Sequence, residues 1–186
     1  MSGIGHNNGP TMEPGQSWRR HVWTRARADL MPKTMPIEVI RMRVRRAEAL
    51  GLPYKTYASI RASTGRDVIG FLFSTNALRL LRQGDALPPD REARLVRIRD
   101  ADRTAMVQPP LRAAEVSGLT GLDAAAPAPG FHLGWPRMRE AVRNVIRARG
   151  LPADGLIVVG ETSAERDWAD AGRTAGFLSG DRFFGA

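Results

Sequence analysis

The sequence contains no cysteine, and its apolar runs are short. The absence of thiols excludes disulfide scaffolds, iron–sulfur clusters and thiolate nucleophiles. The longest apolar run, Val68–Phe73, is too short to cross a bilayer. The first residues, Met1–Pro14, are polar and glycine-rich, which does not fit a secretory signal peptide. We therefore expect a soluble, cytoplasmic protein with no membrane partner.

Acidic residues are scarce in the first third of the chain. Residues 1–66 hold 12 Lys and Arg against 4 Asp and Glu, a net charge of +8, whereas residues 67–186 hold 16 against 15. Only Lys33 and Lys55 are lysine, and a bias towards arginine does not explain the missing acids. A basic segment beside a neutral body suggests a polyanionic partner. We expect DNA or RNA, and a protein partner or a homodimer stays open.

Changes in composition divide the chain into three parts. Residues 1–17 lack a hydrophobic period and predict a disordered tail. Residues 18–65 predict a basic helical segment, and residues 67–186 a small α/β domain with a Gly/Ala/Pro-rich loop at 118–136. Residues 4–10 resemble an N-terminal tag of assorted bacterial proteins, some of them phage-associated or regulatory. That resemblance implies no fold.

Helices are expected at 18–30, 36–50 and 54–63 in the basic segment. The second has apolar residues at helical spacing, at Ile37, Ile40, Val44 and Ala47. In the body, apolar runs predict strands at 68–73, 104–108 and 156–159. Further helices are expected at 77–82, 138–150 and 164–175, and one more is expected to begin at a cap residue, Asp90. Trp135 and Trp168 are expected in the core. This order indicates an α/β, three-layer-like fold with few, mostly parallel strands, which a partner protein could complete.

Residues 43–62 resemble the helix-turn-helix of DNA-binding proteins. The motif has a small residue in its first helix, glycine in the turn four positions later, and apolar residues six and nine positions beyond. Ala47, Gly51, Tyr57 and Ile60 fall at these offsets. The resemblance implies a recognition helix at 54–62 in the major groove. The side chains expected at the nucleic acid are Arg41, Arg45, Lys55, Thr56, Ser59 and Arg61. The alternative is a structural helical hairpin with solvated arginines.

Two acidic stretches resemble motifs of haloacid-dehalogenase-like phosphatases. Asp100–Thr104 has the spacing of that family's nucleophile motif, and Gly160–Glu165 is similar to its acidic motif. The resemblance implies carboxylates that hold Mg²⁺ and attack a phosphate in a degenerate enzyme acting on a phosphorylated ligand. The alternative, which we favour, is solvated acids and a capped helix start. We assign no catalytic residue and no cofactor.

Hydroxyl-rich turns offer a further candidate. Ser74, Thr75 and Asn76 follow an expected strand, where backbone N–H groups can bind a phosphate, although the same residues are ordinary helix caps. The three histidines, at positions 6, 21 and 132, lack the spacing of metal ligands. The leading hypothesis is therefore a nucleic-acid-binding regulator. The alternatives are the enzyme above and a non-catalytic protein- or ribonucleoprotein-binding module.

Overall fold

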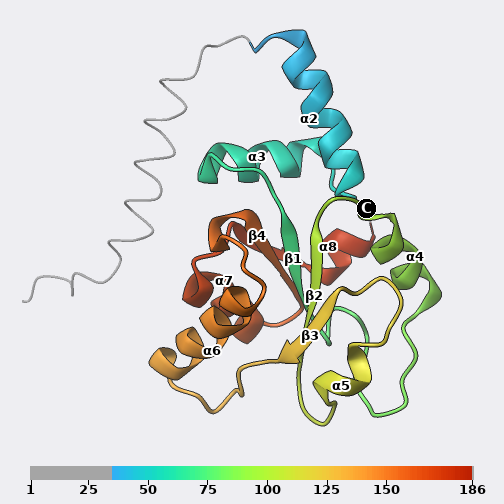
Figure 1. Ribbon diagram of the computed structural model, residues 1–186, viewed down its shortest axis with the longest axis vertical. Coiled ribbons are helices and arrows are strands. Elements are labelled where there is room, and N and C mark those ends of the chain that lie inside the picture. Colours follow the sequence, from blue (N-terminus) through green and yellow to red (C-terminus); the bar gives the residue numbers. More distant parts are fainter. Residues whose placement is uncertain (1–34, 186) are drawn as a thin grey trace, which may run out of the picture. The chain divides into compact units, whose positions relative to one another are not determined.

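The computed structural model describes residues 35–185, so the expected tail and the helix at 18–30 lie outside the described residues. Residues 35–186 form one compact unit. Its centre is a five-stranded, all-parallel sheet in the order β3-β2-β1-β4-β5 (Figure 1). The strands are β1 Gly70–Ser74, β2 Asp102–Val107, β3 Ala124–Pro127, β4 Leu156–Gly160 and β5 Gly176–Ser179.

Helices precede the sheet and connect its strands. They are α2 Ile37–Ala49, α3 Tyr54–Thr64, α4 Pro89–Arg97, α5 Ala113–Val116, α6 Trp135–Ala148, α7 Ser163–Gly172 and α8 Gly180–Phe184, with a 3₁₀ turn at Ala153–Gly155. No helix within residues 35–185 combines the length and the apolar character needed to cross a membrane.

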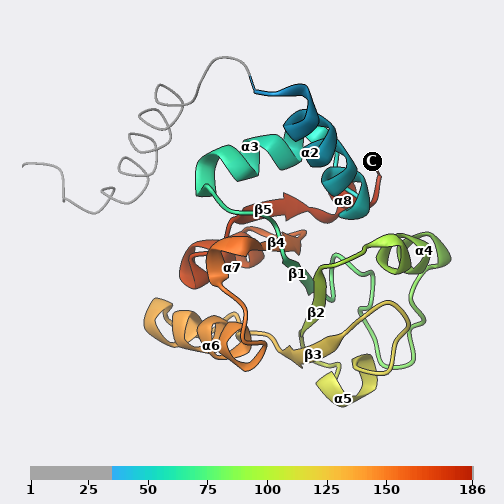
Figure 2. The ribbon, with the colours of Figure 1, turned by 45° about the horizontal axis from the view of Figure 1, so that its top comes forward.

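Alternating side chains of the strands bury two separate cores. Phe71 and Phe73 of β1 belong to the core under α2, α3, α4 and α8, whereas Leu72 belongs to the core under α6 and α7. Successive strand residues point to opposite faces, so apolar residues at every position require cover on both sides. The helices on the two faces supply this cover (Figures 1 and 2).

The order of the strands creates a switch point between β1 and β4. From β1 the chain proceeds through α4 to β2 and on to β3, then returns through α6 to β4 on the other side of β1. In open parallel sheets the crevice at the carboxyl ends of the strands beside such a switch point is the usual place for a ligand. We call this end of the sheet the carboxyl edge, and the opposite end the amino edge.

The α/β fold class is confirmed, and the sheet has more strands than the sequence predicts. Strand β3 lies inside the stretch expected to be a loop, and β5 was also missed. The helix expected at 77–82 is wrong, because this segment forms turns, and Pro88 rather than Asp90 precedes the first residue of α4. Trp168 is buried as expected, but Trp135 is 46% exposed and is not a core residue.

Candidate functional site

The helices α2 and α3 cross at a tight turn (Figure 2). Gly51 in this turn has a φ of +66°, a conformation that L side chains rarely adopt. Ala47 and Tyr57, which occupy motif positions, are each 1% exposed and pack in the same core as Leu50. These two positions therefore lie on the buried side of the hairpin.

Arg46 connects the end of α2 to the amino edge of the sheet through hydrogen bonds. Its Nε donates to Asp67 Oδ2 at 2.9 Å, and its Nη2 donates to the carbonyl oxygens of Val68 at 2.8 Å and Asp100 at 3.0 Å. Bonds to an ionised donor are among the stronger hydrogen bonds in proteins. They fix the orientation of the hairpin relative to β1 and β2.

A second contact holds α3 to the same carboxylate. The hydroxyl of Tyr57 donates to Asp67 Oδ1 at 2.7 Å, and Nη1 of Arg61 lies 3.4 Å from that oxygen. Burial, and then the hydrogen bond to the Asp67 carboxylate, raise the pKa of Tyr57 above 10.0. The folded state therefore favours the neutral phenol of Tyr57.

Four of the six expected nucleic-acid contacts lie at the surface. Arg41 and Arg45 are exposed on α2, and Lys55 and Ser59 are exposed on α3. The three cations form no ion pair with another residue in the described part of the chain. They are free to meet an anion.

The other two expected contacts do not face solvent as the motif predicts. Thr56 is 8% exposed, and its hydroxyl accepts a hydrogen bond from Nη2 of Arg182 in α8 at 3.3 Å. Arg61 is partly buried beside Asp67. Thr56 and Arg61 differ from the expectation for one reason: their side of α3 packs on the rest of the protein. The exposed side of α3 is the one that carries Lys55 and Ser59.

At the carboxyl edge, a buried carboxylate fills the switch point. Glu165 is 0% exposed, and its Oε1 accepts from the amides of Asn76 and Gln108, each at 2.9 Å. Its Oε2 accepts from the backbone N–H groups of Glu161 at 2.6 Å and Thr162 at 2.9 Å. The charge is met by four donors from the ends of β1, β2 and β4. The chain's own side chain thus occupies the place where a ligand usually lies in such sheets.

The hydroxyls of the expected anion site are engaged with the backbone. Ser74 Oγ accepts from the N–H of Ala77 at 3.0 Å, and Thr75 Oγ1 accepts from the N–H of Gln108 at 3.2 Å. Both side chains are buried. These contacts fit a structural role in closing the turn after β1.

Glu161 is the carboxylate at this edge whose hydrogen bonding is incomplete. Its Oε1 is buried and accepts no hydrogen bond within the described residues, and it lies 3.8 Å from Nη2 of Arg79. Burial, and then the nearby charge of Asp181, raise the pKa of Glu161 above its ordinary value. The folded state therefore holds the proton of this carboxyl more tightly than the unfolded chain does.

Replacement of Glu161 by glutamine is expected to stabilise the protein at neutral pH. Because the folded pKa is raised, the stability linked to this group is present below the ordinary pKa of 4.5 and is lost as pH rises through the folded value. Thermal unfolding at acidic and neutral pH should give a higher Tm for Glu161→Gln at neutral pH and a smaller change with pH. The exposed Glu48→Gln is the control, and a lower Tm of Glu161→Gln at neutral pH would contradict the assignment.

The two phosphatase-like motifs lie at opposite edges. Asp102 is the first residue of β2 and pairs in register with Gly70, which also pairs with Leu156 at the start of β4. Glu161 follows the end of β4, so it lies about 16 Å further along the strand direction. Asp102 is bonded instead to Nε of Arg149 at 2.9 Å. The motifs cannot hold one Mg²⁺ between them, and residues 35–185 contain no cluster of acids and histidines suited to a metal.

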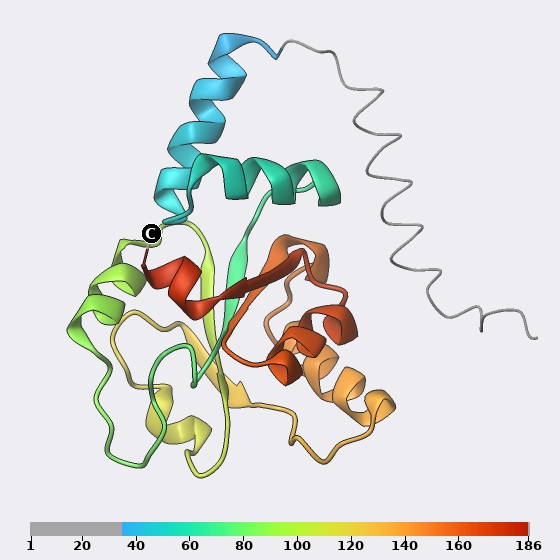
Figure 3. The same cartoon turned by 180° about the vertical axis from the view of Figure 1, so that it is seen from behind.

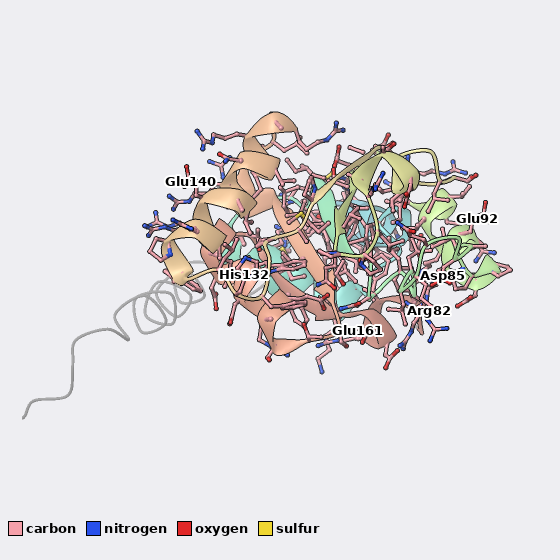
Figure 4. All side chains as sticks on the ribbon, turned by 90° about the horizontal axis from the view of Figure 1, so that it is seen from below. Arg82, Asp85, Glu92, His132, Glu140 and Glu161 are labelled. Carbon is pink, nitrogen blue, oxygen red and sulfur yellow. The ribbon has the colours of Figure 1, made fainter. Side chains whose placement is uncertain are left out.

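A shallow hollow lies between the β1–α4 connection and α5. Its lining includes Leu80, Leu111 and Val116, together with the carboxylates Asp85 and Glu115. Hydrogen bonds from the backbone N–H groups of Leu81 and Arg82 lower the pKa of Asp85, which keeps it ionised. Figure 4 shows Asp85 on the α4 side, away from His132 and Glu140 beside α6. Two carboxylates make this hollow unsuited to a phosphate.

Comparison of the chain with protein-family models, curated proteins and solved structures gives no match.

Proposed function

We propose that the protein binds duplex DNA through the α2–α3 hairpin, as a DNA-binding regulator. The observation that carries the proposal is the distribution of buried and exposed side chains on this helical hairpin. Ala47 and Tyr57 are buried on the inner side, while Lys55 and Ser59 are exposed together near the start of α3. In helix-turn-helix proteins it is the first residues of the second helix that reach base edges.

The chemistry of the outer face supports this role. Lys55 can donate to guanine, and Ser59 can bond a base or a phosphate. The next exposed positions of α3, Ala62 and Ser63, are small, so they leave space for the helix to approach the groove. The positive end of the helix dipole lies on the same side as Lys55.

The attachment of the hairpin also supports binding. The carbonyl oxygen of Gly51 accepts from Nη2 of Arg94 at 2.7 Å, and Arg46 bonds the amino edge. Hence the positions of the turn and of the end of α2 are already fixed in the unbound protein. A pre-organised surface loses less conformational entropy on binding.

Charge reversal at Arg45 and Lys55 is expected to weaken binding to duplex DNA at least tenfold. Fluorescence anisotropy of a labelled duplex over a salt series measures this, because each lost phosphate contact lowers the salt slope by about 1. The matched control is Arg82→Glu with Arg97→Glu, two exposed arginines near α4.

Circular dichroism should be unchanged in both double variants. Equal weakening by Arg45→Glu/Lys55→Glu and by the control pair would assign binding to net charge rather than to the hairpin. The absence of duplex binding by the wild type at low salt would refute the proposal.

A further inference from the structure

A second basic surface lies on α6 and the loop before it. Phe131 is 65% exposed and Trp135 is 46% exposed, although both are large aromatic residues. The helix that follows has a single acid, Glu140, and four arginines, at positions 137, 139, 143 and 147. We refer to Phe131, Trp135 and these arginines as the α6 surface.

The spacing of the arginines on the α6 surface places like charges close together, although Arg147 in the last turn is favourable with the helix dipole. Arg139, Arg143 and Arg147 follow one another at four-residue spacing, where like charges repel each other and destabilise a helix. Arg137 lies in the first turn, which has no acid, and so opposes the helix dipole. None of the four forms an ion pair within residues 35–185. Their arrangement is explained by a bound anion better than by stability.

The inner face of α6 is already occupied. Val142, Val145 and Ile146 are buried in the core with Leu72 and Trp168. An amphipathic helix that binds a membrane must bury its apolar face in lipid. Because α6 uses that face against the sheet, its charged outer face is left for a water-soluble anion.

We propose that the α6 surface binds single-stranded nucleic acid. Arg139, Arg143 and Arg147 stand about 6 Å apart along the helix axis, a repeat suited to a chain of phosphates. Phe131 in the loop before α6 and Trp135 at its first residue offer rings on which unpaired bases stack. Basic grooves with exposed aromatic side chains are the common design of single-strand binding.

This site is separate from the α2–α3 hairpin. The hairpin packs in the core that holds Phe71, whereas α6 packs in the core that holds Leu72, on the opposite face of the sheet. Figures 1 and 3 show the two regions apart from front and back. The inference therefore goes beyond the proposed duplex binding and does not depend on it.

Fluorescence anisotropy with a labelled oligothymidylate tests the proposal. The variant Arg139→Gln/Arg143→Gln should bind about tenfold more weakly, whereas Arg82→Gln/Arg97→Gln, with the same loss of charge, should bind as the wild type. The variant Phe131→Ala/Trp135→Ala keeps every charge and should also lose about tenfold, because base stacking is lost. Binding should quench tryptophan fluorescence in the wild type, and less in this aromatic variant.

The competing ligands are outcomes of the same experiment. Competition by polyglutamate as strong as by oligothymidylate, or binding to phosphatidylserine vesicles that the arginine variant abolishes, would overturn the proposal. So would unchanged oligonucleotide binding in both α6 variants. The hairpin variant Arg45→Glu/Lys55→Glu should retain oligothymidylate binding, which separates failure of this proposal from failure of duplex binding.

Discussion

Replacement of Glu165 by alanine is expected to lower the free energy of unfolding by about 3–5 kcal/mol. The carboxylate is fully buried and accepts from the side chains of Asn76 and Gln108 and from two backbone N–H groups. Each donor left without a partner costs about 1–3 kcal/mol, reduced where water can enter. Urea denaturation of the purified protein measures the loss.

Two further variants separate the hydrogen bonds from the charge and from the helix itself. Glu165→Gln should cost less than alanine, because the amides of Asn76 and Gln108 can rotate to present their oxygens to the new NH₂ group. Asp167→Ala, an exposed position on α7, should stay within about 0.5 kcal/mol of the wild type. A loss below about 1 kcal/mol for Glu165→Ala would show that the network is not structural.

Replacement of Arg46 by alanine is expected to cost about 3 kcal/mol, since it removes charge-assisted bonds to Asp67 and to two backbone carbonyls. For a chain of this size the loss corresponds to roughly 6–12 °C in Tm. The expected structural result is a hairpin that moves relative to the amino edge. The proposed duplex binding should weaken as well, although Arg46 itself points to the amino edge of the sheet.

The neighbouring Arg45 provides a matched control for stability. It is exposed and forms no ion pair with residues 35–185, so Arg45→Ala should leave Tm nearly unchanged. The variant Tyr57→Phe removes one donor to Asp67 and should cost about 1 kcal/mol. If Arg46→Ala and Arg45→Ala had the same Tm, Arg46 would not be the fastening of the hairpin.

The side-chain hydrogen bonds at the two ends of the sheet differ in what they hold. At the carboxyl edge, Glu165 closes the position at which ligands bind in similar topologies. At the amino edge, Arg46 holds a hairpin whose outer face has free cations. The hairpin and α6 both present arginines without an ion pair within residues 35–185, which is why both proposals concern polyanions.

The sequence alone determined the elements whose signal is local. The apolar spacing in α2 and α6, the turn residues before α7 and the apolar runs of β1 and β4 predict those elements near their observed bounds. Glycine at position 51 predicts the turn of the hairpin, because the left-handed conformation favours glycine. Such features depend on neighbours a few residues away along the chain.

Contacts between residues far apart along the chain could not be predicted from the sequence. Ala124–Pro127 has no strand-forming side chain, and it becomes β3 because β2 offers its backbone groups in register. Thr56 was expected at the surface, but it faces Arg182, which no local pattern connects with it. Charge, helix spacing and turn residues are local features of the sequence. Whether a cation stays free of an ion pair depends instead on the carboxylates that the fold places beside it.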